Sequence, residues 1–213
     1  MMFDLERFAD RAISEVDRGL RTLAGVTTTR RASPAEPIPE AELTEYERRE
    51  AAALMRVNHC GEVCAQALYQ GQALAAENPK TSATLRQAAE EEEDHLGWSQ
   101  ERIRELDGRT SLLNPLWYAG SLAIGFAAGK LGERWNLGFL RETERQVEQH
   151  LQSHLDRLST RDARTRALVA AMQRDEAGHA AMAERLGASE LPAPAKVAMR
   201  ATSRVMTRLS YWI

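Results

Sequence analysis

Two segments of this 213-residue chain carry the same pair of side chains, a glutamate followed three residues later by a histidine. The first pair is Glu92 with His95, and the second is Glu176 with His179. Residues three apart on a helix lie side by side, so each pair would direct one carboxylate and one imidazole at the same point. One such pair is common by chance. Two of them, each in a segment rich in helix-forming residues, indicate a shared site of carboxylate and imidazole ligands.

A further carboxylate falls where a helical hairpin would place it beside the first pair. Two antiparallel helices bring residues to one level when the residues are equally far from the turn. The Asn-Pro break at residues 78–80 therefore predicts a partner for Glu92 between residues 62 and 68, and Glu62 lies in that window. Glu62 also falls on the apolar face of its predicted helix.

The second pair has a partner of the same kind in the segment before it. A break at residues 159–161 predicts a partner for Glu176 near residues 142–146, which admits both Glu142 and Glu144. Glu148 lies one turn further along and would also fit the hairpin geometry. We prefer Glu144 to Glu148, because Glu144 is better centred on the apolar face of its helix. The two halves of the chain then read as one repeated functional hairpin.

The candidate ligands need cations, because each lies on an apolar helix face where an isolated charge would be prohibitively costly. Two divalent cations would balance the four carboxylates if the imidazoles are neutral. Oxygen and imidazole donors without thiolate suit iron or manganese better than a structural zinc. A glutamate from each of two helices and Glu-x-x-His from each of two others is the ligand pattern of ferritin-like di-metal bundles. The six candidate ligands are Glu62, Glu92, His95, Glu144, Glu176 and His179.

The elements that must position these residues are predicted to be helices. Helix-forming residues are plentiful, only 13 Gly and 7 Pro occur, and no long run alternates with the period of a strand. We predict an all-α fold, a ferritin-like four-helix bundle with additional N-terminal and C-terminal helices. Residues 1–43 form one unit, an amphipathic helix over 3–23 followed by a Pro-rich linker, and residues 44–213 form the bundle domain.

Five helices are expected after the linker. Short breaks at 78–80 and 159–161 imply antiparallel hairpins. The predicted helices cover residues 44–77, residues 81–106, a third segment ending near 158, residues 162–186, and a last segment beyond 194 that runs almost to the end.

Residues 110–129 contain no charged side chain and include three glycines. A membrane span, a plain core helix and a surface that contacts membrane or lipid substrate are all compatible with this composition. We favour the contact surface, because Trp117, Tyr118 and Phe126 suit a boundary that is half wet and half apolar. The last helix carries Arg200, Arg204 and Arg208 at steps of four, which fits either a membrane surface or a solvated face.

Composition argues against several partners and compartments. The net charge of −3 argues against a nucleic-acid partner. The two cysteines, Cys60 and Cys64, are too few for a disulfide framework and are interpreted as reduced, packed thiols. The first residues carry Asp4, Glu6 and Asp10 where a secretory signal would be apolar, so we expect a chain without a targeting peptide.

Other polar groups near the candidate ligands have two readings each. The acidic run at residues 90–94 is interpreted, apart from Glu92, mainly as a solvated face. His59, His150 and His154 either orient ligand carboxylates or serve as capping and surface residues.

Taken together, these motifs resemble the demethoxyubiquinone hydroxylases, the di-iron monooxygenases of ubiquinone biosynthesis. The resemblance covers roughly residues 44–213 and keeps the motifs in order. Cys60 departs from the family pattern, but it lies outside the candidate ligand set. The segments that carry the resemblance are Met55–Glu62, Gln66–Gln72, Glu92–Leu96, Thr143–Glu148 and Asp175–His179.

The resemblance implies two Fe ions held by the same six residues, with Glu92 and Glu176 bridging and with Glu62 and Glu144 terminal. It implies hydroxylation of a polyprenylated benzoquinol ring with O2 and two reducing electrons. It also implies a peripheral position on the membrane surface, at the cytoplasmic face of the cell membrane. Further copies of the chain and other quinone-biosynthesis proteins are the protein partners left open. Iron storage, peroxide detoxification and a non-catalytic membrane adaptor are the competing functions, and they explain fewer of these features.

Overall fold

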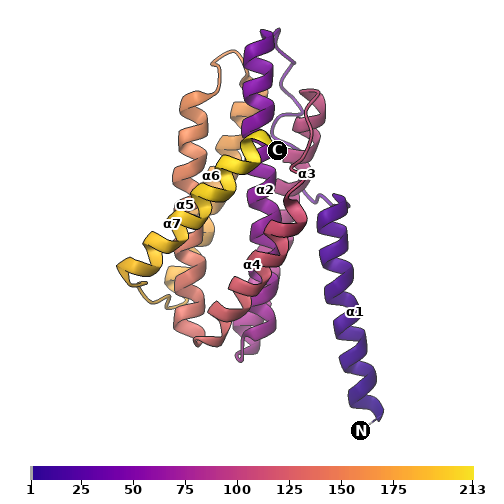
Figure 1. The fold of residues 1–213 in the computed structure, drawn as a ribbon, viewed down its shortest axis with the longest axis vertical. Coiled ribbons are helices and arrows are strands. Elements are labelled where there is room, and N and C mark those ends of the chain that lie inside the picture. The colour runs from indigo at the N-terminus through magenta and orange to yellow at the C-terminus, as the bar shows by residue number, and fades with distance from the viewer. Residues whose placement is uncertain (1) are drawn as a thin grey trace.

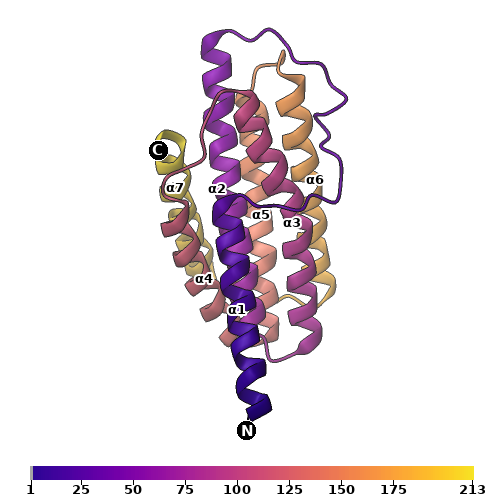
Figure 2. The same ribbon diagram turned by 90° about the vertical axis from the view of Figure 1, so that its right-hand side faces the viewer.

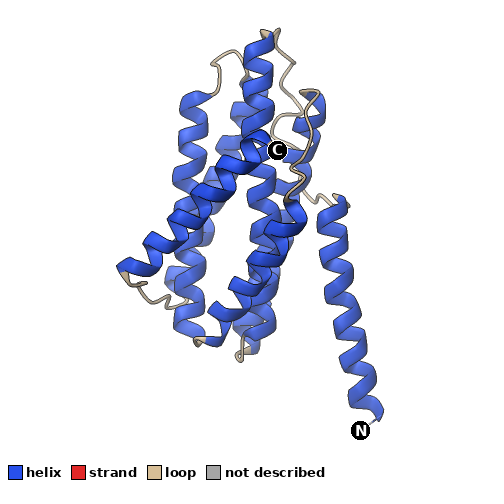
Figure 3. Cartoon of the chain, viewed as in Figure 1, coloured by secondary structure: helices blue, strands red, loops and turns tan. Residues whose placement is uncertain are grey.

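The computed structural model describes the backbone of residues 2–213 and the side chains of residue 10 and residues 13–213. Every regular element within residues 2–213 is a helix (Figure 3). The predicted all-α class is therefore confirmed. The apolar face predicted for the first helix depends in part on side chains outside the described ones. The helices are α1 (Met2–Ala24), α2 (Glu45–Ala75), α3 (Pro79–Glu105), α4 (Asn114–Lys130), α5 (Glu133–Arg157), α6 (Ala163–Arg185) and α7 (Ala193–Trp212).

Helices α2 and α3 form one antiparallel hairpin of the bundle, and α5 and α6 form the other (Figure 1). Local capping fixes where these helices begin. The Thr44 hydroxyl accepts a hydrogen bond from the Glu47 amide, and the Glu47 carboxylate accepts one from the Thr44 amide, which is a capping box. The side chains of Asn78 and Asp162 cap α3 and α6 in a similar way. Short, capped turns thus set the levels at which the two hairpins align.

Two of the apolar clusters in the core lie on either side of a polar layer. One cluster includes Leu54, Ile103, Leu151 and Met172, and the other includes Tyr69, Leu85, Leu140 and Ala183. Each of the four bundle helices contributes residues to both clusters. The predicted metal ligands lie between those two groups of residues along each helix. The bundle therefore places a polar layer in its interior, closed above and below by packed apolar side chains.

The segment before residue 158 contains two helices rather than the single helix predicted. Gly132 separates α4 from α5 and has a φ of 96°, a conformation that disfavours residues with a side chain. Six helices therefore follow the linker, not five. A Cβ on Gly125 of α4 would overlap the Leu68 carbonyl oxygen, and one on Gly71 of α2 would overlap the Leu122 carbonyl oxygen. The two backbones touch, and α4 lies flat along α2.

The uncharged stretch at residues 110–129 lies mainly in α4, which begins at Asn114 and ends at Lys130. Throughout the described part of the chain, no helix combines the length and the apolar character that a membrane crossing requires. One face of α4 packs on α2, while Leu116, Ile124 and Phe126 remain exposed. Helix α1 lies beside the bundle in Figure 1, and in both views its N-terminal end projects beyond the bundle (Figures 1 and 2).

The linker between α1 and α2 lies across α3 and α6 (Figure 2). Arg102 of α3, which is only 1% exposed, forms an ion pair with Glu40 near the C-terminal end of the linker. The same guanidinium pairs with Asp162 at 2.9 Å and donates to the Thr165 hydroxyl at 2.8 Å. A buried arginine with this many partners holds the linker, α3 and the start of α6 together.

We expect Gly125→Ala to lower the free energy of unfolding by about 1–3 kcal/mol, because the new methyl group forces α4 away from α2. Gly120→Ala on the same helix is the matched control, because nothing lies within 4 Å of its Cβ position. That control should gain up to about 1 kcal/mol from reduced freedom of the unfolded chain. Urea unfolding followed by far-UV circular dichroism measures both changes. Equal effects of the two substitutions would contradict the close backbone contact.

Candidate metal centre

The structure brings all six predicted ligands together in the polar layer. Glu62 comes from α2, Glu92 from α3, Glu144 from α5 and Glu176 from α6, and each is at most 3% exposed. The two imidazoles come from α3 and α6, the helices that also carry Glu92 and Glu176. Four buried carboxylates at one level are not found in an ordinary helical core, because each would have to be neutralised.

The six side chains form two overlapping clusters. Within each cluster one ligand atom from every residue lies within 4.8 Å of the others. Glu92 and Glu176 belong to both. The first cluster is Glu62, Glu92, His95 and Glu176, and the second is Glu92, Glu144, Glu176 and His179. Two adjacent positions with two shared carboxylates are what a pair of cations would require.

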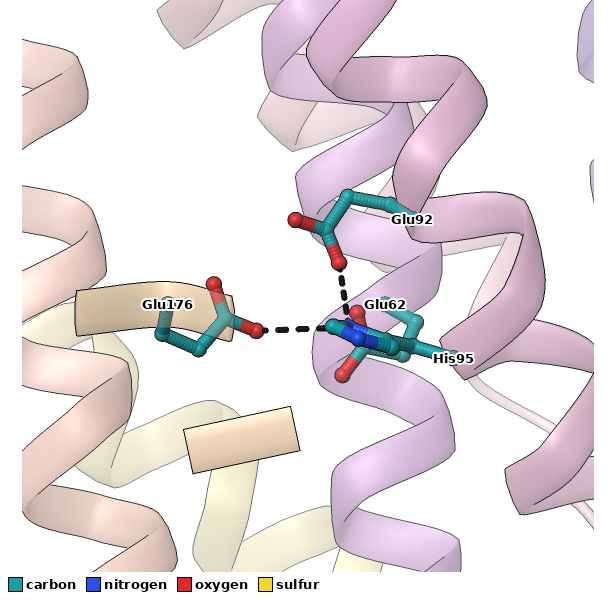
Figure 4. Close-up of side chains that lie close together, drawn as sticks. All are labelled: Glu62, Glu92, His95 and Glu176. Atoms are coloured by element: carbon teal, nitrogen blue, oxygen red, sulfur yellow. Dashed lines mark ion pairs between the residues drawn. The ribbon is translucent and has the colours of Figure 1, made fainter. Parts of the chain in front are cut away.

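The shared carboxylates each offer one oxygen to each imidazole. Glu92 places Oε2 at 2.6 Å from His95 Nδ1 and Oε1 at 2.8 Å from His179 Nδ1. Glu176 places Oε1 at 3.5 Å from His95 Nδ1 and Oε2 at 3.8 Å from His179 Nδ1. Figure 4 shows both carboxylates converging on His95, with Glu62 behind it. The imidazoles thus direct Nδ1 inward.

The structure separates Glu144 from its two neighbours of the same type. Tyr69 of α2 donates its phenolic hydrogen to Glu144, which fixes that carboxylate in the layer. Glu142 accepts from Gln146 at 2.7 Å and faces α7 instead. Glu148 belongs to neither cluster. The preference for Glu144 therefore agrees with its location.

The outer nitrogen of each imidazole contacts a carboxylate from the opposite hairpin. His95 Nε2 of α3 lies 3.0 Å from Asp175 Oδ2 of α6. His179 Nε2 of α6 lies 2.9 Å from Glu91 Oε2 of α3. Glu91 is thus not merely part of a solvated face, as the acidic run suggested. The sequence contains a signal for both contacts, because an acidic residue directly precedes each Glu-x-x-His.

The other three histidines do not orient these ligands. In the described part of the chain, none of His59, His150 and His154 hydrogen-bonds to a residue of the clusters. Burial lowers the pKa of His59 and of His150 to about 4, and it lowers the pKa of His154 to about 2. They are neutral imidazoles within the bundle. Of the two readings left open by the sequence, the orienting one is therefore not supported for these three, and the contacts with the imidazoles come from Glu91 and Asp175.

The four carboxyl groups of the layer do not ionise alike without a cation. Burial raises the pKa of Glu62 and of Glu144, and the neighbouring carboxylates raise it further. Burial also opposes ionisation of Glu92, but the charges of both histidines outweigh it and lower the pKa. The pKa of Glu176 is lowered despite burial by contacts with Glu144 and both histidines. Without a cation, Glu92 and Glu176 therefore ionise more readily than Glu62 and Glu144.

The two imidazoles supply the remaining neutralisation. Burial favours a neutral His95, but Glu92, Asp175 and Glu176 raise its pKa well above the usual range. Burial is likewise outweighed at His179, whose pKa is raised to about 12 by Glu176 and Glu92. The two imidazoles therefore favour their charged form beside the carboxylates of Glu92 and Glu176. Protons and cations would compete for the same atoms of this layer.

The donor set fits such cations. Both oxygens of Glu92 and the inward Nδ1 atoms of His95 and His179 are buried without a well-formed hydrogen bond. Such atoms are costly in a folded protein unless something binds them. Carboxylate and imidazole donors suit iron and manganese. The buried cluster could therefore hold metal ions.

Comparisons with known proteins show which family the chain resembles over most of its length. The family model of the ubiquinone biosynthesis protein COQ7 matches residues 49–210. A 3-demethoxyubiquinol 3-hydroxylase from Chromobacterium violaceum is 60% identical over 202 residues, which is 95% of this chain and 98% of the relative. Relatives with the same name from Nitrosomonas europaea and Burkholderia multivorans are 58% and 56% identical, each covering 96% of this chain and 98% and 99% of the relative.

Metal binding should release protons and should strengthen as the pH rises. The pKa values of Glu62, Glu144, His95 and His179 are all raised, and each of these groups must be deprotonated to bind a cation. Because protons compete with the cation for the same atoms, acidification favours the protonated site over the metal-bound one. Adding Zn2+ to metal-free protein in weak buffer with an indicator dye measures the release. Binding that is independent of pH would contradict this account.

We expect Glu62→Gln and Glu92→Gln to affect the metal-free protein differently. The first replaces a carboxyl whose ionisation burial opposes by an amide of the same shape, so the free energy of unfolding should hardly change. The second removes the carboxylate that lies 2.6 Å from His95 and 2.8 Å from His179, which should cost about 3 kcal/mol. Urea unfolding in the presence of a chelator compares the two variants. Equal stabilities would show that the protons are distributed otherwise.

Proposed function

The chain belongs to the COQ7 family of ubiquinone biosynthesis proteins, and we propose that it is a 3-demethoxyubiquinol 3-hydroxylase that uses two iron ions. The names of relatives with near-complete coverage support the reaction. The observation that carries the metal chemistry is the pair of overlapping clusters with two shared carboxylates. Residues 44–213 would form the di-iron domain. Iron storage and a non-catalytic adaptor are disfavoured by the family.

We propose that Glu62 and His95 complete one iron position and that Glu144 and His179 complete the other. Glu92 and Glu176 would bridge, because each presents one oxygen to each imidazole. Four carboxylates then match two divalent ions in charge. That balance makes the layer tolerable within the apolar interior.

The bound irons would supply the redox chemistry that activates O2 for reaction with the ring carbon. In the proposed reaction one oxygen atom enters the ring C–H bond, and the other leaves as water after uptake of two electrons and two protons. The chain itself excludes water from the layer through the apolar clusters on either side. Asp175 and Glu91 keep the imidazole rings turned inward.

We propose that α4 and α7 dock on the membrane surface at its cytoplasmic face, where a polyprenylated substrate is found. Figures 1 and 2 both place these helices on the same side of the bundle. Exposed apolar residues on this side include Leu116, Ile124 and Phe126 of α4 and Val205, Leu209 and Trp212 of α7. Arg200, Arg204 and Arg208 are exposed on the same helix as Trp212. Apolar anchors with arginines suit an anionic lipid surface.

We expect Glu144→Gln to lower the iron content toward one ion per chain and hydroxylation by about 100-fold or more. Glu148→Gln, one turn along the same helix and outside both clusters, should retain both ions and full turnover. Iron analysis of the purified variants and chromatographic quantification of the hydroxylated quinone test the pair. Equal behaviour of the two variants would remove Glu144 from the ligand set.

Replacing Arg200, Arg204 and Arg208 together by Gln should weaken binding to anionic vesicles by roughly 100-fold, at about 1 kcal/mol for each arginine. Flotation with vesicles of phosphatidylglycerol and phosphatidylcholine measures this loss. Vesicles of phosphatidylcholine alone should show little difference between the two proteins. Wild-type protein that never floats would reject the docking surface.

A further inference from the structure

Part of the linker is closely fitted to the bundle beside the metal centre. Residues 27–40, which we call the strap, lie across α3 and α6. A Cβ on Gly97 of α3 would lie 2.5 Å from Thr29 Cγ2 and 3.0 Å from Thr27 Oγ1, so the helix surface is hollowed where the strap crosses it. Ala35 is buried in the core cluster at one end of the bundle. The strap is therefore packed as part of the fold.

Arg31 of the strap joins the two helices that carry the Glu-x-x-His pairs. Its Nε donates to Asp94 Oδ2 of α3 at 2.8 Å, and its Nη1 donates to Asp175 Oδ2 of α6 at 2.8 Å. The backbone amides of Arg30 and Arg31 also donate to Asp94 Oδ1. Asp94 is only 2% exposed, and among the described side chains Arg31 is the one cation that contacts it.

A tryptophan holds the guanidinium in this position. Trp98 of α3 donates its indole hydrogen to the Arg31 carbonyl at 3.2 Å, and the guanidinium lies 4.8 Å from the centre of the Trp98 ring. The Trp98 ring in turn lies 5.5 Å from the His95 ring, centre to centre. Arg31 is thus fixed by backbone, aromatic and carboxylate contacts, which leaves its fork little freedom.

The contact with Asp175 leads directly to a proposed metal ligand. Asp175 Oδ2 lies 2.8 Å from Arg31 Nη1 and 3.0 Å from His95 Nε2. A carboxylate on the outer nitrogen of a metal-binding histidine sets the orientation of its ring. We propose that Arg31 is a positioning residue that clamps Asp94 to Asp175 and thereby holds His95 ready for metal, an inference that rests on the proposed metal centre.

The other iron position has no corresponding clamp. Glu91, which contacts the outer nitrogen of His179, has a side chain that is 46% exposed. Its other side-chain hydrogen bond comes from Gln87 at 3.0 Å, and no arginine or lysine pairs with it among the described side chains. The two positions are therefore unequal, and loss of Arg31 should affect the His95 position selectively.

The test uses Co2+ titration of the full-length, metal-free protein, followed by visible absorption and calorimetry. We expect two Co2+ per wild-type chain. In Arg31→Met, one of the two affinities should fall by about 10–100-fold while the other stays within error. Arg31→Lys should recover part of the loss, because an ammonium cannot bind both carboxylates as a planar fork does. A merely structural role would not divide the two affinities in this way.

Arg30→Met is the matched control from the same strap. The Arg30 side chain pairs with the exposed Glu90, and its backbone contact with Asp94 survives the substitution. Both Co2+ affinities should remain as in the wild type. Equal losses in Arg30→Met and Arg31→Met would overturn the proposal, as would wild-type affinities in Arg31→Met.

Two further backgrounds identify the position that is affected. With His179→Gln, the intact position is the one that contains His95, so adding Arg31→Met should weaken the remaining Co2+ by the same 10–100-fold, a factor of about the size known for such orienting contacts. With His95→Gln, adding Arg31→Met should change little, because the pair acts on one site. The reverse pattern would reject the assignment to His95.

Failure of this proposal can be told apart from failure of the proposed function. Wild-type protein that binds no Co2+ or iron would reject the metal centre itself. Wild-type protein that binds two ions and hydroxylates its substrate, with Arg31→Met binding equally well, would reject only the clamp. If Arg31→Met does not fold, Asp175→Asn breaks the same chain of contacts within the bundle. Unchanged affinities in that variant would then overturn the proposal.

Discussion

Four negative charges in an apolar interior are the constraint on which the rest of this structure depends. Carboxylates at most 3% exposed must be neutralised where they lie. Without metal, the raised pKa values of Glu62 and Glu144 and the contacts of Glu92 with both imidazoles reduce this charge, and in the proposed holoenzyme two divalent ions would balance it. Protons and cations would then compete for the same six side chains, which couples metal binding to proton release.

The polar layer also joins the two hairpins to each other. His95 of α3 contacts a carboxylate of α6, and His179 of α6 contacts a carboxylate of α3. Glu92 of α3 lies close to the imidazoles of both hairpins. Reciprocal contacts of this kind fix the relative level of α3 and α6, while the apolar clusters on either side supply most of the packing. The contacts that set the geometry of the site therefore also align the two hairpins.

The elements outside the four-helix bundle divide between two tasks. Helix α4 packs flat on α2 through glycine contacts and, with α7, forms an outer layer that leaves apolar side chains exposed. Such a layer suits a lipid substrate whose reacting ring must reach a buried centre. The strap lies across the helices that carry the Glu-x-x-His pairs, where Arg31 and Arg102 tie it to them. Residues before the bundle therefore take part in the architecture of its centre.

The sequence by itself determined the helical class, the two hairpins and the six ligand candidates, because a helix repeats every 3.6 residues and a short turn aligns residues equally far from it. That arithmetic pointed to Glu62, and together with the apolar face of its helix it favoured Glu144 over Glu148. Only the tertiary structure decided the break at Gly132 and the contacts of Glu91 and Asp175 with the histidines. It alone revealed Arg31, which is 63 residues from Asp94 and 144 from Asp175. Contacts between separate elements follow from how helices pack in three dimensions, and no local period in the sequence encodes them.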